Sequence, residues 1–258
     1  MLRFSTINGL AIAILFILFT GSTFYNIPWW PYLVWALVWF TLTTIGSFHV
    51  RWNYHINALH SNKNKVENHI ALTFDDGPHP EFTPKILHLL ARYNAKATFF
   101  CIGKNIETNE TLFKDIVTAG HTIGNHTYSH TKSFGFLSAE KVIDELQKNN
   151  VIVQQLTGKE IRLYRPAFGV TNPNIKKALK ATGLQAIGWS IRSLDTTQRS
   201  ETQVLRRITK SIAKGDVVLL HDTSDKTVAV LEQLLLFLQE QNLQSVTIDQ
   251  LFNIKAYA

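Results

Sequence analysis

Thr73-Phe74-Asp75-Asp76-Gly77-Pro78 is the stretch that decides the fold of this 258-residue chain. It closes an apolar run that begins at Ile70, and two adjacent carboxylates at the end of such a run repel each other unless a cation holds them. A divalent metal ion is one such cation. Further along the chain stands His126-Thr127-Tyr128-Ser129-His130, whose two histidines are four apart and can point the same way from one helical turn.

One carboxylate and two imidazoles are the donor set of a catalytic zinc site that keeps a position for water. The sequence therefore predicts that Asp76, His126 and His130 hold a divalent metal, with Asp75 beside them as a candidate base. Each piece alone has an ordinary structural explanation, because an Asp pair can cap a turn and a His-x-x-x-His pair is more often found in packing. The metal interpretation depends on their occurring together with three further motifs.

Five motifs in this order are similar to those of the polysaccharide deacetylase family, also called the NodB-homology domain or carbohydrate esterase family 4. The resemblance covers residues from about His69 to Ile248, roughly the C-terminal three quarters of the chain. The motifs are Thr73–Gly77, His126–His130, Arg165-Pro166-Ala167-Phe168-Gly169, Trp189-Ser190-Ile191-Arg192-Ser193-Leu194-Asp195 and Leu219-Leu220-His221-Asp222.

The resemblance implies a hydrolase that removes an N-acyl group, acetyl in the first place, from an N-acetylated aminosugar in a polysaccharide such as peptidoglycan or a chitin-like glycan. It implies that Asp76, His126 and His130 bind one divalent ion, zinc in the first place, with cobalt or nickel as alternatives. Asp75 would accept a proton from the attacking water, and His221 would protonate the departing sugar nitrogen.

The same resemblance assigns supporting roles to four other residues. Arg165 would keep Asp75 ionised and oriented through charge-assisted hydrogen bonds. The backbone N–H of Phe168 would stabilise the oxyanion of the tetrahedral intermediate. Trp189 and Leu219 would line a small acyl pocket.

Two motifs depart from the family pattern. The third has Ala167 where a second proline is usual. The fourth has Arg192 in place of its first acid and Thr196 in place of its tryptophan. Asp195 remains as a candidate catalytic residue, whose partner is either His221 or Arg192.

From His69 onward, strand-like runs alternate with helical ones, which indicates a parallel sheet with helices outside it. The motifs fall at or after the C-terminal ends of strands, where a barrel builds its active site. The resemblance refines the fold class to a distorted, incomplete (β/α) barrel of about seven units. The predicted strands are Ile70–Phe74, Ala97–Ile102, His121–Gly124, Ile161–Tyr164, Gln185–Trp189, Asp216–Leu220 and Gln244–Ile248, and the helices Thr83–Tyr93, Glu110–Ala119, Ser138–Leu156, Asn172–Thr182, Glu201–Ala213 and Thr227–Gln241.

Between Arg3 and Arg51 the chain has no Asp, Glu, Lys or Arg. This is long enough for two membrane crossings at roughly 20 residues each, which we place near 7–24 and 32–48 with a turn rich in Pro and Trp between them. A cleaved signal peptide is the alternative for the first segment. We expect three parts: a transmembrane hairpin at 1–51, a polar linker at 52–68 and a deacetylase domain at 69–258.

The flanking charges favour a cytoplasmic catalytic domain, because Arg3 precedes the first span while Arg51, Lys63 and Lys65 follow the second. The function of the family favours the outside instead. A substrate that reconciles the two is a lipid-linked aminosugar, deacylated or deformylated at the cytoplasmic membrane face. A third alternative is a catalytically silent, membrane-tethered glycan-binding protein. The formal net charge of +7 comes with dispersed lysines and no nucleic-acid recognition motif, so nucleic acid is not an expected partner.

Overall fold

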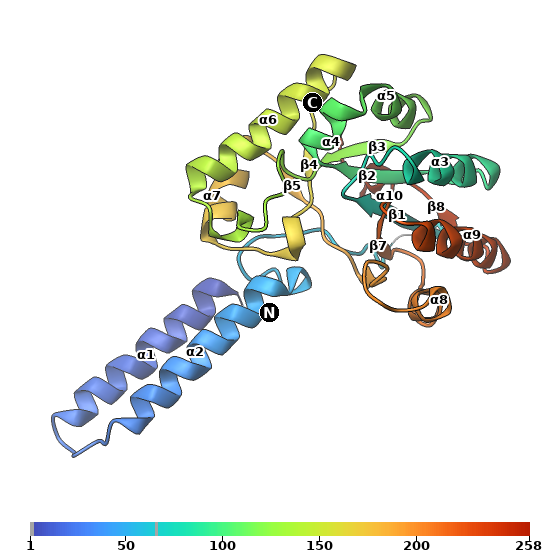
Figure 1. Ribbon diagram of the computed structural model, residues 1–258. Coiled ribbons are helices and arrows are strands. Elements are labelled where there is room, and N and C mark those ends of the chain that lie inside the picture. The colour runs from blue at the N-terminus through green and yellow to red at the C-terminus, as the bar shows by residue number, and fades with distance from the viewer. Residues whose placement is uncertain (1–2, 65–66) are drawn as a thin grey trace.

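The structure is a computed structural model that describes residues 3–64 and 67–258. Lys65, one of the residues used above for membrane orientation, lies outside the described residues. Figure 1 shows two parts, a long helical hairpin and an α/β domain. They meet where the first helix of the hairpin begins and its second helix ends.

The α/β domain is built on one curled sheet in which every pairing between strands is parallel. In the described residues the strand order is β5-β4-β3-β2-β1-β7-β6, and β8 also pairs with β1. The prediction of an incomplete (β/α) barrel is confirmed. The strands are β1 (His69–Asp75), β2 (Ala97–Cys101), β3 (Thr122–Asn125), β4 (Leu163–Tyr164), β5 (Gln185–Ala186), β6 (Ile191–Arg192), β7 (Val217–His221) and β8 (Gln244–Ser245).

Helices surround this sheet on its outer side (Figure 1). The α-helices of the domain are α3 (Phe82–Arg92), α4 (Gly103–Thr108), α5 (Glu110–Thr118), α6 (Ala139–Thr157), α7 (Pro173–Thr182), α8 (Glu201–Thr209), α9 (Asp225–Glu240) and α10 (Ile248–Phe252). Three short 3-10 helices are η1 (Val50–Trp52), η2 (Phe134–Phe136) and η3 (Ala167–Gly169).

The central strand β1 separates two hydrophobic clusters. Leu72 and Phe74 pack into the cluster under the helices, while Ala71 belongs to the cluster inside the curl of the sheet. Because side chains alternate along a strand, Thr73 and Asp75 share the inner face with Ala71. The apolar run therefore delivers Asp75 to the inner face at the C-terminal end of the sheet.

Local expectations differ from the structure at several places. The predicted strand Gln185–Trp189 ends at Ala186, and the predicted strand Gln244–Ile248 ends at Ser245 because Ile248 starts α10. Strand β6 and helix α4 were not expected, since each is too short to show a period.

The hairpin consists of α1 (Phe4–Ser22) and α2 (Trp30–Phe48), close to the predicted spans. Both helices are long and apolar enough to cross a membrane. They are joined by hydrogen bonds from indole and phenol groups of α2: Trp35 Nε1 to the Ala11 carbonyl (2.9 Å), Trp39 Nε1 to Asn8 Oδ1 (2.8 Å) and the Tyr32 hydroxyl to the Leu18 carbonyl (3.0 Å).

Backbone hydrogen bonds tie the domain-side end of the hairpin to its surroundings. The Phe4 N–H donates to the Tyr54 carbonyl (3.0 Å), and the Thr171 N–H donates to the Ser47 carbonyl (2.8 Å). After η1 the chain runs along the α/β domain, where the Asn62 N–H donates to the Gly215 carbonyl (2.7 Å). Tyr54, His55, Ile56 and Ala58 are buried along this path.

Candidate active site

Neighbouring strands bring two of the predicted catalytic residues together. In the β1–β7 ladder Asp75 is the register partner of His221, so the base and acid candidates stand at the ends of adjacent strands. Strand β3 lies two places away from β1 and leads directly into His126. The motifs therefore meet at the C-terminal edge of the sheet, as expected for a barrel of this kind.

Asp76, His126 and His130 form a compact donor group in which all ligand atoms lie within 4.8 Å of one another. Asp76 Oδ1 is 3.3 Å from His126 Nε2 and 3.5 Å from His130 Nε2. Ligands at about 2.0–2.2 Å from a tetrahedral ion are about 3.3–3.6 Å apart, so the spacing suits one shared metal. His130 Nε2 is also buried without a hydrogen-bond partner, which a bound cation would explain.

The protonation states suit metal binding. His126 Nδ1 lies 3.0 Å from the Arg165 carbonyl, which can only accept, so Nδ1 carries the proton and Nε2 keeps its lone pair. Burial is the main cause that lowers the pKa of His130 to about 4, which keeps this imidazole neutral. Burial alone would raise the pKa of Asp76, but the adjacent His126 outweighs this and holds the pKa below its usual range, so the carboxylate is ionised.

The two histidines come from an irregular loop rather than from the helical turn that their spacing suggested. Thr127 and His130 both have positive φ, 65° and 46°, which a helix does not allow. Helix α6 holds the loop in this shape. Glu145 accepts hydrogen bonds from the Tyr128 and Ser129 N–H groups (3.1 and 2.8 Å), and the Asn149 amide donates to the Thr127 carbonyl (2.6 Å).

Asp75 is buried beside a fully buried arginine. Arg165 Nη1 is 3.4 Å from Asp75 Oδ1 and donates to the Thr73 hydroxyl at 3.1 Å. The guanidinium carbon lies 4.3 Å from the centroid of the Phe100 ring. Burial lowers the pKa of Arg165, against the raising effect of Asp75, and two of its nitrogens have no hydrogen-bond partner among the described residues. Arg165 therefore lies within ion-pair distance of Asp75, but the predicted hydrogen bond between them is not formed among the described residues, and Nη1 donates to Thr73 instead.

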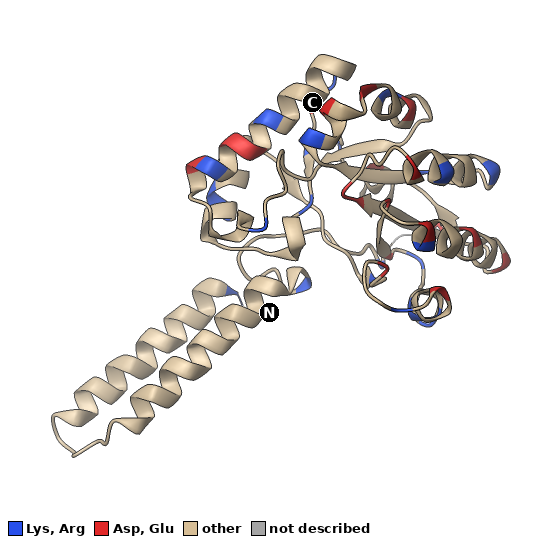
Figure 2. Cartoon of the chain, in the orientation of Figure 1, with Lys and Arg blue, Asp and Glu red and all other residues tan. Residues whose placement is uncertain are grey.

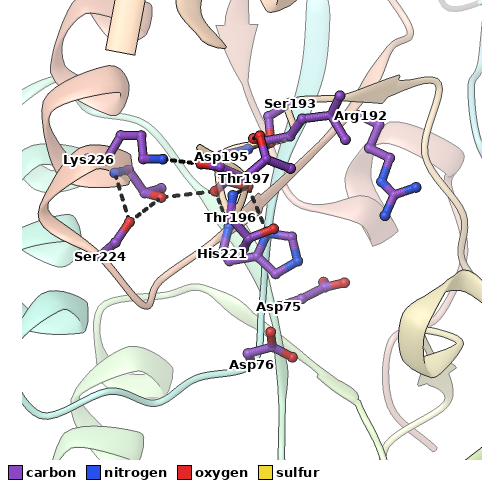
Figure 3. A network of polar contacts seen from close by, with 12 residues as sticks. Asp75, Asp76, Arg192, Ser193, Asp195, Thr196, Thr197, His221, Ser224 and Lys226 are labelled. Atoms are coloured by element: carbon purple, nitrogen blue, oxygen red, sulfur yellow. Dashed lines mark hydrogen bonds and ion pairs between the residues drawn. The ribbon is translucent and has the colours of Figure 1, made fainter. Parts of the chain in front are cut away.

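Asp195 is bound to His221 and not to Arg192 in the described contacts. Its carboxylate accepts from the His221 backbone N–H and lies 2.8 Å from His221 Nδ1, while Ser193 and Thr227 hydroxyls also donate to it. Figure 3 shows the imidazole extending from Asp195 on the side where Asp75 and Asp76 lie. Burial would lower the pKa of His221, but the hydrogen bond and charge of Asp195 raise it to about 9, with smaller contributions from Asp75 and Asp76.

The remaining predicted residues lie around this centre. Phe168 has a positive φ of 56°, and its ring centroid is 4.4 Å from that of His130. Trp189 and Leu219 are buried in the hydrophobic cluster inside the sheet. The Trp189 ring is 5.5 Å from the Arg165 guanidinium carbon. The structure thus gathers all ten predicted site residues at one end of the sheet.

Sequence reasoning missed Glu145, Asn149 and Asn105, which support the loop of His126 and His130 and the backbone of Asp76. Glu145 and Asn149 lie four apart on α6, and Asn149 is fully buried on the apolar face of this helix. In the sequence, an Asn on the apolar face of an amphipathic helix was the available signal. Asn105 donates to the Asp76 carbonyl at 2.7 Å. Asp222 is fully buried and accepts from the Thr83 hydroxyl, and burial raises its pKa to about 7.

Comparison with known proteins agrees with the family resemblance that the sequence motifs indicated. A family model for polysaccharide deacetylase matches residues 62–187. A peptidoglycan-N-acetylglucosamine deacetylase of Bacillus cereus is 36% identical over 195 residues, covering 72% of this chain and 89% of the relative. The Listeria monocytogenes enzyme PgdA is 35% identical over 196 residues, 75% of this chain but only 41% of that protein.

Among solved structures, the Bc1960 peptidoglycan N-acetylglucosamine deacetylase aligns with a TM-score of 0.73 and 31% identity, covering 78% of this chain and 94% of that one. The curled parallel sheet with its surrounding helices agrees with this structural match. The chain belongs to the polysaccharide deacetylase family, the NodB-type carbohydrate esterases of family 4, and is a hydrolase of carbon–nitrogen amide bonds.

Proposed function

We propose that this protein is a membrane-bound, metal-dependent deacetylase that removes the N-acetyl group from an aminosugar in a glycan such as peptidoglycan or a chitin-like polymer. The names of its relatives support this substrate class. The observation that carries the mechanism is the register of β1 and β7, which sets Asp75 opposite His221 beside the Asp76-His126-His130 group.

A divalent ion, zinc in the first place, would be held by Asp76, His126 and His130, and when bound it would polarise the amide carbonyl and acidify water. Asp75 then takes the proton of the attacking water, and Arg165 keeps this carboxylate charged and directed. The Phe168 N–H donates to the oxyanion that develops on the carbonyl oxygen.

His221 supplies the proton that the departing sugar nitrogen needs. Asp195 keeps the imidazole protonated near neutral pH and, by holding Nδ1, directs Nε2 towards the leaving group. Trp189 and Leu219 form an apolar wall that suits a methyl group. The altered fourth motif therefore retains the acid pair and changes only the surroundings of the substrate.

The catalytically silent alternative is the weaker one. A glycan-binding protein needs no buried ion pair between Asp195 and His221 and no Asp75 beside a metal-ligand group. Charged groups that are fully buried are costly to keep unless they have a role. Their combined presence supports turnover.

We further propose that residues 1–51 anchor the enzyme in a bilayer, that 52–68 connect the anchor to the enzyme and that 69–258 form the catalytic domain. Figure 2 shows the two hairpin helices without charged residues along their length, with basic residues only near the domain. These flanking charges favour the cytoplasmic side for the domain.

The function is tested by incubating the full chain in detergent with chitooligosaccharides and with peptidoglycan fragments, and by measuring released acetate and new free amines. We expect release that a chelator abolishes and zinc restores. Asp75→Asn serves as the matched inactive control. If neither substrate loses acetyl groups with metal present while the control is indistinguishable from the wild type, the proposal fails.

A further inference from the structure

A basic groove of about 950 Å³ lies between the domain-side end of the hairpin and helix α8, next to the active site. Phe48 and Val50 belong to the hairpin end of its wall, and Trp189 and Ile191 to the sheet. Six basic side chains line it: Arg51, Arg192, Arg199, Arg206, Arg207 and Lys210. We call this cavity, together with the residues that line it, the basic groove.

In the described part of the chain, the cations of the basic groove are not matched by acidic side chains in its lining. The lining contains no Asp or Glu, and the ion pairs found within residues 3–64 and 67–258 involve none of the six cations. Three of them instead donate to neutral oxygens: Arg51 to the Ser190 carbonyl, Arg207 to the Arg192 carbonyl and Arg199 to the Thr197 hydroxyl. Such anchoring fixes guanidinium groups while their charge stays available, which favours an anionic ligand.

The basic groove reaches the catalytic centre through Arg192. Arg192 is the register partner of Leu219 in the β6–β7 ladder, and partners in a parallel ladder place their side chains on the same face. Two residues further along β7 is His221, which shares that face. The Arg192 guanidinium carbon is 6.0 Å from the centroid of the Trp189 ring, and the Arg165 guanidinium carbon is 5.5 Å from the same centroid. The Trp189 indole therefore lies near both an arginine of the groove and the arginine that accompanies Asp75.

The basic groove also begins where the hairpin ends. Phe48 is the last residue of α2, is 59% exposed and lines the groove, and Arg51 follows it on η1. If the hairpin crosses a bilayer, this end lies at the level of the lipid headgroups. An anion bound here would have apolar lipid on one side and the active site on the other.

We propose that the basic groove binds the phosphate linkage of a lipid-linked N-acetylated aminosugar, so that the lipid tail lies along α2 and the sugar reaches Trp189. This inference rests on the proposed deacetylase function and specifies its substrate. Phosphate suits the groove because its oxygens accept several charge-assisted hydrogen bonds from guanidinium groups at once. Arg192, which stands where the family has an acid, adds a cation at the junction between the groove and the active site.

The first test is equilibrium binding, which needs no turnover. The full chain in a neutral detergent is titrated with a short-chain polyprenyl diphosphate N-acetylglucosamine, with and without a chelator. Arg206→Gln with Lys210→Gln should weaken binding about tenfold or more, because two cations that face the phosphate are lost. The matched control is Lys114→Gln with Lys255→Gln, the same charge change on α5 and near the C-terminus, which Figure 1 shows away from the hairpin. Equal weakening by both pairs, or no binding by the wild type, would overturn the inference.

Two further ligands identify the source of the phosphate. N-acetylglucosamine 1-phosphate has the phosphate without lipid, and phosphatidylglycerol has a lipid phosphate without the aminosugar. We expect both to bind more weakly than the lipid-linked sugar. If N-acetylglucosamine 1-phosphate binds as tightly as the lipid-linked sugar, the lipid is not part of what the groove recognises. If phosphatidylglycerol binds as tightly, the groove is a site for membrane lipid and not for the substrate.

Kinetics separate this inference from the proposed function. On the lipid-linked sugar, the groove variant should raise KM with little change in kcat, because the phosphate is held equally in ground state and transition state. The control pair should leave KM unchanged. A wild type that deacetylates chitooligosaccharides but neither binds nor deacetylates the lipid-linked sugar would retain the proposed function and exclude this substrate. A wild type that binds the lipid-linked sugar through the groove but deacetylates no substrate would support the binding site and refute the proposed deacetylase function.

Discussion

At the scale of single residues, the two adjacent carboxylates Asp75 and Asp76 have different partners, which fits the separate roles proposed for them. Asp76 Oδ1 lies 3.3 and 3.5 Å from the imidazole nitrogens, whereas the neighbouring Asp75 is oriented by Arg165. The positive φ of Asp76, 76°, turns two consecutive carboxylates in different directions. Two acids that are adjacent in sequence can therefore have different tasks.

Asp75→Asn should retain the metal and lose turnover. The amide keeps the shape of the side chain but cannot accept the proton of water, so we expect kcat to fall about 100-fold or more. Metal content by mass spectrometry and acetate release, measured on the same sample, check both parts. Asp76→Ala is the comparison, because it should lose metal and activity together. Full metal content in Asp76→Ala would refute the ligand assignment.

Asp195→Asn should move the alkaline limb of the kcat/KM pH profile to lower pH. His221 acts in its protonated form, and Asp195 raises its pKa to about 9, so activity falls as pH rises through the pKa of this histidine. Without the charge of Asp195, the pKa drops towards the ordinary 6.5 and activity is lost earlier. A bound dication opposes the contributions of Asp75 and Asp76, which leaves Asp195 as the main support.

Ser193→Ala is the control for this profile, since it removes one neutral hydrogen bond to Asp195 and leaves the charge in place. Its alkaline limb should stay close to that of the wild type. An unshifted limb in Asp195→Asn would show that another group controls the loss of activity at high pH.

At the scale of elements, the long apolar strands were predicted closely, the short strands β4, β5 and β8 were predicted with bounds that were too long, and β6 was missed. Strand β1 is an unbroken apolar run that ends in carboxylates, so both its type and its direction could be read from sequence. Strand β6 has two residues, and its place next to β7 is set by pairing with Val218 and Leu219, far along the chain. Strand propensity and hydrophobic periodicity are local properties of the sequence, so they carry no information on such long-range contacts.

The donor set of the site was predictable because residue identity alone specifies it. The loop geometry that presents it was not. His126 and His130 converge through positive φ values that Glu145 and Asn149 stabilise from α6, and a four-residue spacing suggested a helix instead. The partner of Asp195 could not be chosen from sequence either, because its bond with His221 joins residues 26 apart in the chain that only the fold brings together.

Gly215→Ala should destabilise the domain more than Gly158→Ala. Both glycines have positive φ, 81° and 70°, so each substitution carries the left-handed penalty of about 1 kcal/mol. A Cβ at Gly215 would come 2.0 Å from the backbone oxygen of Asn62, whereas a Cβ at Gly158 meets nothing within 4 Å. We expect a total of about 2–4 kcal/mol at Gly215, seen as a lower Tm in thermal unfolding of the full chain in detergent. Equal Tm losses would mean that the segment at Asn62 is not held against the domain.

At the scale of the whole molecule, both chain ends should lie on the same side of the membrane. The hairpin returns to its starting level, since the Phe4 N–H is bonded to the Tyr54 carbonyl and the catalytic domain follows. Reporters of compartment fused before Met1 and after Ala258 should therefore agree, and from the basic flanks we expect both to report the cytoplasm. Opposite results from the two fusions would mean that only one of the helices crosses.

The short path between hairpin and domain sets how far this enzyme can reach. If the hairpin crosses a bilayer, the backbone hydrogen bonds of Ser47 and Phe4 at the junction hold the described part of the domain close to the membrane surface. The active site would then sweep a thin layer of fixed height, moving in two dimensions as the anchor diffuses. Glycans within that layer are met often, and those beyond it must be brought to the enzyme by their own motion.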